Sequence, residues 1–193
     1  MTRPLLFLDF DDVICLNQTC GGYDAFEAMA LIEEYPELAP EKFRKLWTEL
    51  FDVNAKAYLQ AIHDVWDPWF VLSTTWCRHI KKEALIEILN RSGLDFVAEN
   101  LHSSWTTPRR MHSDIRAGEI RSWHRANPGF ENSWVVLDDE LSGVGLSKWP
   151  ISEESPFIVL CRESVGLTDV EFQKLKTAFL LRAKLHLLNR QPP

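Results

Sequence analysis

Four short runs of apolar residues, with no polar residues alternating between them, stand out along the chain. Such runs are typical of β-strands buried on both faces, because a strand with one wet face alternates apolar and polar residues. Helical sequence separates the runs, and strands that alternate with helices form a parallel sheet through right-handed crossovers. The pattern therefore predicts an α/β protein with a central parallel sheet. The four runs are Leu5–Leu8, Phe70–Leu72 with the preceding Trp69, Trp134–Leu137 and Phe157–Cys161.

The segment between the first two runs, residues 22–66, is longer than a simple crossover connection needs. Pro40 followed by Glu41 is typical of a helix start, and apolar residues then recur at helical spacing. We expect one amphipathic helix to continue from there, preceded by a small helical flap over Tyr23–Leu38 near the end of the first strand. Residues 15–66 are thus predicted to form a flap or cap insertion plus the crossover helix. The apolar positions of the helix are Phe43, Leu46, Trp47, Leu50, Tyr58, Leu59 and Ile62.

Three further helices are predicted from apolar periodicity and end signals. Ile80–Leu89 carries apolar residues at the period of a helix, and Gly93 stands where a helix-ending glycine belongs. Ile115–Trp123 restarts the periodicity, and Asp169–Leu188 closes the chain with a helix. Ser103–Ser113 is predicted to be a loop, because a proline, two arginines and several hydroxyls interrupt any periodicity.

Composition and charge narrow the class of protein. At 193 residues the chain is long enough for one buried core and too short for two independent domains, so residues 1–193 are predicted to form a single domain. The formal net charge of -7 argues against extended nucleic-acid binding, whose affinity comes from Lys and Arg. No stretch approaches a membrane span, and acids interrupt the apolar run near the N-terminus, unlike a signal peptide. Four scattered cysteines lack the spacing of a zinc site and predict reduced thiols and a cytoplasmic location.

Acids and hydroxyls directly follow three of the apolar runs. In parallel sheets, ligands bind beyond the carboxyl ends of the strands, so these side chains are expected to meet in one crevice. Crowded carboxylates repel each other unless a cation lies between them, and hard oxygen ligands without neighbouring His or Cys suit Mg²⁺ rather than zinc. We therefore predict a magnesium site whose candidate ligands are Asp9, Asp11, Asp138 and Asp139.

The same residues predict a reaction. An aspartate beside a metal-held phosphate can attack phosphorus and form an aspartyl-phosphate, which divides one difficult displacement into two. Asp9 can be that nucleophile, and Asp11, two residues on, can protonate the leaving oxygen and later deprotonate the attacking water. Hydroxyls at Ser73, Thr74 and Thr75, together with a nearby cation, can bind the transferring phosphoryl oxygens.

At this point the sequence resembles the haloacid dehalogenase-like (HAD) hydrolase superfamily. Its members carry an apolar strand ending in Asp-x-Asp-x-Val or Thr, a second strand ending in Ser or Thr, a basic residue, and a last strand ending in paired acids. Here these features look like Leu5–Val13, Phe70–Thr74, Arg116 and Val135–Asp139. The resemblance implies a Rossmann-like three-layer sandwich, a phosphorylated Asp9, an acid/base Asp11, and Mg²⁺ held by Asp9, Asp138 and the backbone carbonyl of Asp11.

A second resemblance is narrower. The strings Phe70–Trp76 and Val136–Glu140 are similar to small HAD domains that accompany RNA-repair enzymes, which implies polynucleotide-end phosphatase activity as one candidate. The chain also departs from the superfamily pattern. Asp12 stands where Gly is usual, adding charge beside the nucleophile and making a tight turn less easy.

Several assignments remain open at this level. The basic residue is one of three arginines, of which Arg116 is preferred because it lies in the predicted helix Ile115–Trp123 that leads into the strand with the acid pair; the others are Arg109 and Arg110. The phosphate-binding hydroxyl is either Ser73 or Thr74. Asp9 and Asp11 could instead cap a helix starting at Val13, and the pair Asp138 and Asp139 could be a solvated turn.

The sequence thus predicts a Mg²⁺-dependent phosphohydrolase that cleaves a phosphorylated small molecule or oligonucleotide end. Two alternatives stay open. One is an accessory domain that binds or helps repair polynucleotide ends, which is suggested by local basic residues at Arg109, Arg110 and 121–125. The other is a phosphotransferase, whose first half-reaction is identical and whose acceptor is not water. No membrane association is expected.

Overall fold

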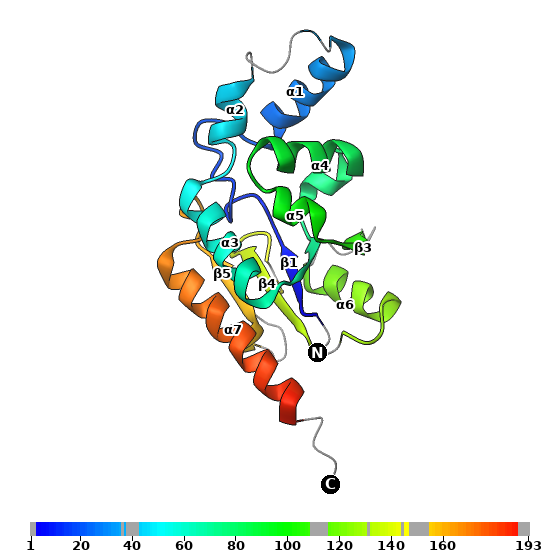
Figure 1. Ribbon diagram of the computed structural model, residues 1–193, viewed down its shortest axis with the longest axis vertical. Coiled ribbons are helices and arrows are strands. Elements are labelled where there is room, and N and C mark those ends of the chain that lie inside the picture. The colour runs from blue at the N-terminus through cyan, green and yellow to red at the C-terminus, as the bar shows by residue number, and fades with distance from the viewer. Residues whose placement is uncertain are drawn as a thin grey trace.

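The computed structural model describes residues 3–35, 37, 43–108, 116–130, 132–143, 145–146 and 155–188. Within these residues five strands form one all-parallel sheet in the order β3-β2-β1-β4-β5 (Figure 1). The strands are β1 (Leu5–Leu8), β2 (Trp69–Leu72), β3 (Leu101–Thr106), β4 (Trp134–Asp139) and β5 (Ile158–Cys161). The helices are α1 (Gly22–Glu34), α2 (Arg44–Glu49), α3 (Val53–Trp66), α4 (Lys82–Arg91), α5 (Asp95–Glu99), α6 (Arg116–Ala126) and α7 (Asp169–Leu188), with short 3₁₀ helices η2 (Thr75–Arg78) and η3 (Ser155–Phe157).

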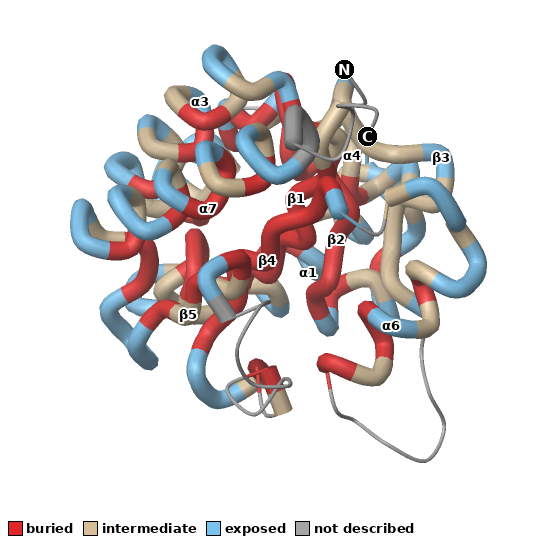
Figure 2. Tube along the Cα trace, turned by 90° about the horizontal axis from the view of Figure 1, so that it is seen from below, coloured by how far each residue is buried: buried red, intermediate tan, exposed pale blue. Residues whose placement is uncertain are grey.

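The predicted Rossmann-like α/β fold with a parallel sheet is confirmed. Strands β1 and β2 have the predicted bounds, and β5 starts one residue later because η3 precedes it. Strand β4 runs two residues further than predicted and takes in Asp138 and Asp139. Figure 2 shows β1, β2 and β4 buried along nearly their whole length, as strands covered on both faces must be.

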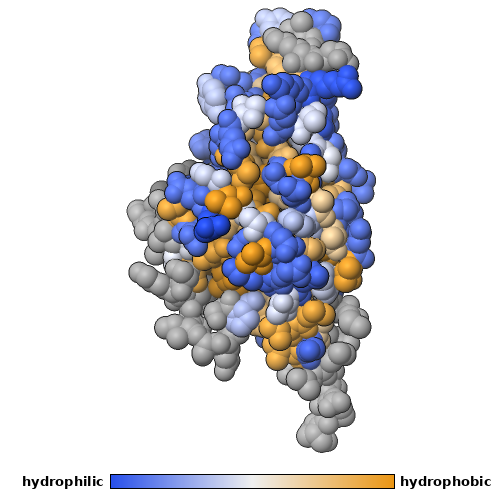
Figure 3. Space-filling model, turned by 90° about the vertical axis from the view of Figure 1, so that its left-hand side faces the viewer, coloured by the Kyte–Doolittle hydropathy of each residue, from blue (hydrophilic) through white to orange (hydrophobic). Residues whose placement is uncertain are grey.

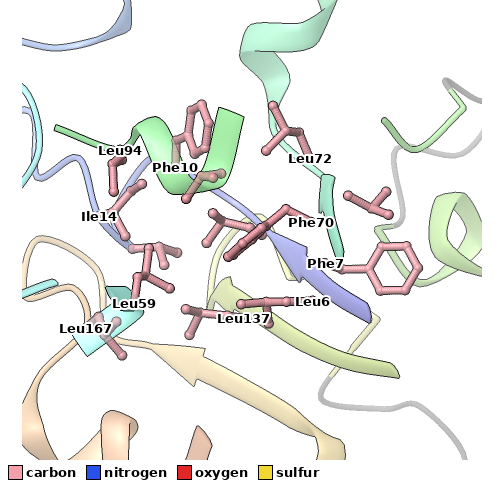
Figure 4. Close-up of a cluster of buried hydrophobic side chains, with 14 of the residues drawn as sticks. Leu6, Phe7, Phe10, Ile14, Leu59, Phe70, Leu72, Leu94, Leu137 and Leu167 are labelled. Atoms are coloured by element: carbon pink, nitrogen blue, oxygen red, sulfur yellow. The ribbon is translucent and has the colours of Figure 1, made fainter. Parts of the chain in front are cut away.

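Helices cover both faces of the sheet. On β1, Leu6 and Phe7 point to opposite faces because successive side chains of a strand alternate. On the face of Phe7, the ring of Trp123 from α6 lies 5.3 Å away in an edge-on contact. Leu6 is in register with Phe70 of β2. On their face of the sheet, the ring of Phe70 meets the ring of Phe96 from α5 edge-on, with centroids 6.1 Å apart. Figure 4 shows how closely the apolar side chains gather around β1.

Helices α3 and α7 pack against each other on the same side of the sheet as α5. Tyr58 stacks on Phe172 with ring centroids 4.5 Å apart, and Trp66 stacks on Phe179 at 5.4 Å. These two contacts lie about two turns apart on each helix. They fix α3, the crossover helix that leads into β2, to the helix that closes the fold.

The prediction of a loop over Ser103–Ser113 is wrong for its first part, since β3 covers Leu101–Thr106. Residues 109–115 lie outside the described residues. Strand β3 is at the edge of the sheet and pairs with β2 alone, so its side chains are mostly half-buried. An edge strand needs no continuous apolar run, and the sequence therefore gave no strand signal there.

The single amphipathic helix predicted through Ile62 is also wrong, because α2 and α3 are separate helices. Phe51, between them, turns into the core and meets Phe10 at 5.5 Å. Asp52 then begins α3 by accepting a hydrogen bond from the Ala55 backbone N–H at 2.8 Å. The spacing of apolar residues continues across this break, which hid it. The predicted helix start at Pro40 and Glu41 falls outside the described residues.

The segment predicted as a helical flap, Tyr23–Leu38, contains α1. Together with α2, this helix lies beyond the end of the sheet, alongside α4 (Figure 1). The other predicted helices appear as α4, α6 and α7, and Gly93 after α4 has the left-handed φ of 76° that favours glycine. Ile115, the predicted first residue of α6, is not among the described residues.

The surface is mixed. Figure 3 shows hydrophilic side chains over much of one face, with apolar side chains between them. Isolated exposed residues such as Val53 and Leu180 are normal on a folded protein. Among the described helices, none has both the length and the apolar character that crossing a membrane requires. All four cysteines are free thiols.

Candidate active site

The site begins with the register of β1. This central strand pairs with β2 on one side and with β4 on the other. The strand order therefore reverses at β1: β2 and β3 follow on one side, and β4 and β5 follow on the other. Crevices that bind ligands form at such switch points. Leu8 is in register with the last residue of β2 and with Leu137 of β4. The next residue of each strand therefore falls in one row, which contains Ser73, Asp9 and Asp138. The Asp9 backbone N–H donates to the Leu137 carbonyl at 3.0 Å and continues this pairing.

Three buried carboxylates meet at this row. Asp9, Asp138 and Asp139 each have an oxygen within 4.8 Å of the oxygens of the other two. One oxygen of each side chain is fixed by a backbone N–H just after it in the chain: from Phe10 at 2.8 Å, from Asp139 at 3.0 Å and from Leu141 at 2.7 Å. The second oxygen of each carboxylate is thereby left for interactions within the site. We call these three residues the carboxylate cluster.

Arg116, the first residue of α6, reaches into the carboxylate cluster. Its Nη2 lies 3.1 Å from Asp9 Oδ2, and its Nε lies 2.8 Å from Asp138 Oδ2. Its Nη1 donates to Glu119 Oε2 at 3.4 Å, one turn along the same helix. All four side chains are buried. A single guanidinium thus pairs with the acid that follows β1 and with an acid of β4, and it also donates to a third acid, Glu119.

Burial and crowding dominate the electrostatics of the carboxylate cluster. Burial raises the pKa of Asp9 to about 7, although Arg116 and the Phe10 N–H lower it. Burial also raises the pKa of Asp138 well above its usual value, and the neighbouring Asp9 adds to the rise. Burial alone would lower the pKa of Arg116, but the surrounding carboxylates, Asp138 first, outweigh burial and raise it. The carboxylate cluster contains three carboxyl groups, and Arg116 supplies a single positive charge.

Asp11 lies outside the carboxylate cluster. Its carboxylate accepts hydrogen bonds from Trp76 Nε1 at 3.0 Å, Asn17 Nδ2 at 3.1 Å and Thr75 Oγ1 at 3.4 Å. These donors come from the chain just after β1 and from η2, so Asp11 is fixed on the side of the site that faces α1. The predicted contact of a metal with the Asp11 backbone carbonyl stays a prediction. The Asp11 side chain is not one of the three clustered carboxylates.

The sequence itself decides the family. Residues 5–172 match the model of the family described as HAD domain in Swiss Army Knife RNA repair proteins. The chain belongs to this family. No curated protein and no solved structure matches it. Both resemblances stated from the sequence are therefore confirmed, and the chain is a HAD domain with a hydrolase- or phosphotransferase-type function.

The donor set of this HAD domain fits a hard divalent cation. Three carboxylates converge, and Asp139 Oδ2 is buried without a hydrogen-bond partner among the described residues. A buried carboxylate oxygen without a partner is costly, and a cation beside it removes that cost. Oxygen-only ligands suit Mg²⁺, the metal that HAD proteins generally use. Asp9, Asp138 and Asp139 are therefore the residues that can hold it.

The two hydroxyls that are candidates for binding phosphate, those of Ser73 and Thr74, have different surroundings. Thr74 Oγ1 accepts a hydrogen bond from the Trp76 backbone N–H at 3.3 Å and caps η2. Ser73 Oγ lies 3.4 Å from Thr107 Oγ1, a long contact, and Ser73 shares the row of Asp9. Ser73 therefore has more freedom to bind a phosphoryl oxygen, and this role remains a prediction for both residues. Arg109 and Arg110, the alternatives to Arg116, lie outside the described residues.

The turn after Asp9 contains Asp12, which stands where glycine is usual in the superfamily. Asp12 has a φ of 55°, in the left-handed region that favours glycine and that aspartate tolerates better than most residues. Its carboxylate accepts a hydrogen bond from the Ser164 backbone N–H at 2.8 Å and ties the turn to the loop after β5. The alternative that Asp9 and Asp11 cap a helix at Val13 is wrong, because residues 12–14 form a turn.

Two residues that the sequence analysis missed support this site. Glu119 is buried between Arg116 and Arg78, whose Nη2 lies 3.2 Å from Glu119 Oε1. Trp76 donates its indole N–H to Asp11. The spacing of three residues between Arg116 and Glu119 on a predicted helix was a usable signal, because residues at that spacing are neighbours on a helix surface. The contact of Trp76 depends on the folded chain and had no local signal.

Proposed function

We propose that this HAD domain is a Mg²⁺-dependent phosphatase that hydrolyses phosphate monoesters through an aspartyl-phosphate on Asp9. The observation that carries the proposal is the meeting of Asp9, just after β1, with Asp138 and Asp139 at the end of β4, around one arginine. A bound Mg²⁺ would relieve the repulsion of these carboxylates and withdraw charge from the phosphate oxygens. In this proposal Asp9 serves as both a metal ligand and the nucleophile.

The chain's own residues divide the work in two steps. In the first, an Asp9 oxygen forms a bond to phosphorus, the bond from phosphorus to the leaving oxygen breaks, and Asp11 gives that oxygen its proton. In the second, Asp11 takes a proton from water, the water oxygen bonds to phosphorus, and the bond to Asp9 breaks to release phosphate. Arg116, paired with Asp9, keeps it oriented throughout, and Ser73 donates to a phosphoryl oxygen in this proposal.

The substrate we propose is a phosphorylated RNA end. The matched family is described by its occurrence in RNA repair proteins, and repair requires ends with defined phosphorylation. An end phosphatase needs no long basic groove, which agrees with the formal net charge of -7. The proposal thus concerns one terminal phosphate and not a long duplex.

The test is a phosphate-release screen over 3'- and 5'-phosphorylated oligoribonucleotides, mononucleotides and sugar phosphates, with Mg²⁺ or with EDTA. We expect release from RNA ends with Mg²⁺ only, and loss of release in Asp9→Asn. Asp12→Asn is the matched control, because it also removes a neighbouring carboxylate charge but keeps an oxygen for the Ser164 N–H. Beryllium fluoride, which mimics a phosphorylated carboxylate, should bind the wild type and not Asp9→Asn. Full activity of Asp9→Asn would exclude the covalent mechanism.

A phosphotransferase is the second candidate, since the family supports hydrolase- and phosphotransferase-type chemistry alike. Both share the attack by Asp9 and differ in the acceptor that Asp11 deprotonates. Adding alcohols or nucleoside acceptors to the reaction separates the two. Transfer to an acceptor at the expense of free phosphate would favour the transferase. Binding of RNA ends without any turnover would favour an accessory role instead.

A further inference from the structure

A hollow of about 630 Å³ lies beside Asp11, between α1 and the segment that follows β2. This volume is within the range of small-molecule sites in proteins. The hollow connects the acid/base residue of the proposed reaction with the helix of the flap segment, which has no part in the carboxylate cluster. Its lining consists of Asp11, Asn17, Gly22, Tyr23, Phe26, Thr75, Trp76, His79 and Ile80.

From its position, we infer that this hollow binds the leaving group of the substrate, an inference that rests on the proposed function. A general acid must come within hydrogen-bond reach of the oxygen that it protonates. The phosphoryl group belongs at Asp9, so the remainder of the substrate extends past Asp11. Because Asp11 is fixed towards η2 by Trp76 and Thr75, the departing alcohol must occupy the space in front of these residues. That space is the hollow.

The lining favours a flat, neutral, aromatic group. Tyr23 and Phe26, three residues apart on one face of α1, keep 71% and 44% of their surfaces exposed although both are aromatic. Among the described residues of the lining, Asp11 is the one carboxylate, and no lysine or arginine belongs to them. A second phosphate would therefore find neither the ammonium of a lysine nor the guanidinium of an arginine among the described residues that form the hollow. An aromatic ring, by contrast, gains stacking on exposed aromatic faces.

A sugar is a poorer fit for the same walls. Its hydroxyls need several hydrogen-bond partners, and three of the polar lining side chains, Asn17, Thr75 and Trp76, already donate to Asp11. We propose that the hollow, hereafter the base pocket, binds the nucleobase of the nucleotide whose phosphate is removed. The base stacks on Tyr23 and Phe26, and its ribose oxygen is the leaving group beside Asp11.

The test compares two substrates in one variant. For the double variant Tyr23→Ala/Phe26→Ala, we expect the ratio of kcat/KM for adenosine 3'-phosphate to kcat/KM for glycerol phosphate to fall about tenfold or more, because stacking on an aromatic side chain contributes roughly that much. Tyr35→Ala is the matched control, an exposed aromatic residue at the end of α1 and outside the base pocket. It should leave the ratio unchanged. The ring-preserving variant Tyr23→Phe should also retain the ratio, and an unchanged ratio in the double variant would overturn the proposal.

A binding measurement separates failure of the base pocket from failure of the proposed function. Adenosine carries no phosphate, so its binding to the wild type, followed by saturation-transfer NMR, reports on the base pocket alone. We expect the double variant to bind adenosine about tenfold more weakly. If the wild type hydrolyses no phosphate ester but shows this difference, the phosphatase proposal fails and the base pocket stands. If it hydrolyses esters but binds adenosine no better than the double variant, the base pocket fails.

The source of the base is decided by substrate length. A second hollow of about 590 Å³ shares Phe26, His79 and Ile80 with the base pocket and continues between α1 and α4, past Lys81. A higher kcat/KM for a 3'-phosphorylated trinucleotide than for adenosine 3'-phosphate would support an RNA end as the source. Equal values would support a free nucleotide. In either case the loss caused by Tyr23→Ala/Phe26→Ala must persist for the base pocket to hold.

Discussion

Trp76 donates its indole N–H to Asp11 Oδ2 at 3.0 Å, across 65 residues of sequence. The indole is 5% exposed and is wedged between two rings, edge-on to Phe10 at 5.1 Å and stacked on Phe51 at 5.9 Å. Phe10, which lies between Asp9 and Asp11 in the chain, thus belongs to the apolar core. A core side chain therefore fixes the direction of the proposed acid/base residue, and packing and catalysis are coupled at this contact.

Trp76→Phe keeps an aromatic ring and removes the donor to Asp11. Because a misdirected general acid matters most when the leaving group is a poor one, we expect kcat for an alkyl phosphate to fall about tenfold or more. For an aryl phosphate with an acidic phenol, protonation of the leaving group contributes little, and kcat should change much less. Steady-state kinetics with the two substrates measures this difference.

Trp66→Phe provides the control for that comparison. The ring of Trp66, at the end of α3, stacks on Phe179 of α7 near the amino end of β2. The substitution therefore changes packing without contacting the site. Trp66→Phe should lower kcat for both substrates to the same small extent. Equal losses on both substrates in Trp76→Phe would mean that the indole serves packing alone.

The carboxylate cluster was predictable from sequence because its logic is topological. Apolar runs mark buried parallel strands, and the carboxyl ends of neighbouring strands meet at one edge of the sheet. Asp9 and Asp138 follow such runs directly, so their meeting depends on strand order alone. Arg116 was preferred over two other arginines because it begins the helix that feeds β4. Its ion pairs with Asp9 and Asp138 agree with that preference.

What the sequence did not predict depends on contacts between elements far apart. Strand β3 is an edge strand whose half-buried residues carry no apolar run. The break between α2 and α3 exists because Phe51 enters the core against Phe10, a partner 41 residues away. The orientation of Asp11 is likewise set by Trp76, which no local pattern links to it. Local periodicity gives the elements, whereas these features follow from their assembly.

Arg116→Met should destabilise the protein strongly in the absence of metal. It leaves Asp9 and Asp138 buried without the guanidinium that pairs with them, and breaking such a buried pair costs roughly 3–5 kcal/mol of the free energy of unfolding. Mg²⁺ should restore part of the loss, because it supplies positive charge to these two acids. Urea unfolding with Mg²⁺ and with EDTA measures both effects.

Arg91→Met is the comparison for that variant. Arg91 forms a partly exposed pair with Glu87 one turn away on α4, and such a pair within a helix contributes about 0.3–0.5 kcal/mol. A similar small loss in Arg116→Met, or a loss that Mg²⁺ leaves untouched, would contradict the assignment of Arg116 to the metal-binding acids.

The stabilisation by Mg²⁺ should increase with pH. Burial raises the folded-state pKa of Asp9 to about 7 and that of Asp138 well above its usual value, so the metal-free fold holds protons that the unfolded chain has released. Stability is therefore lost as pH rises from about 4 through 7. Mg²⁺ binds the ionised carboxylates, so its gain in Tm should be larger at pH 8 than at pH 5.5.

Proton release gives an independent measure of the same effect. Calorimetric titration of Mg²⁺ at pH 7 in buffers of different ionisation enthalpy should show protons leaving the protein on binding. Asp138→Asn should reduce both the release and the gain in Tm. An equal gain in Tm at the two pH values would show that these carboxylates are ionised before the metal arrives.

Glu119→Gln tests whether the acid behind Arg116 positions it. Glu119 gives one oxygen to Arg116 at 3.4 Å and the other to Arg78 at 3.2 Å. A glutamine has one acceptor for two arginines, and its amide N–H groups face a guanidinium. We expect kcat to fall about tenfold and the free energy of unfolding to fall by roughly 1–3 kcal/mol, the cost of an unsatisfied buried group.

A double-mutant cycle separates positioning from simple loss of stability. Arg78→Met frees the single glutamine oxygen for Arg116, so Arg78→Met/Glu119→Gln should recover part of the kcat lost in Glu119→Gln. Glu87 is a partly exposed acid paired with Arg91, and Glu87→Gln should change neither kcat nor stability appreciably. If the two substitutions at positions 78 and 119 lower kcat additively, Glu119 does not act through the orientation of Arg116, and its effect belongs to folding alone.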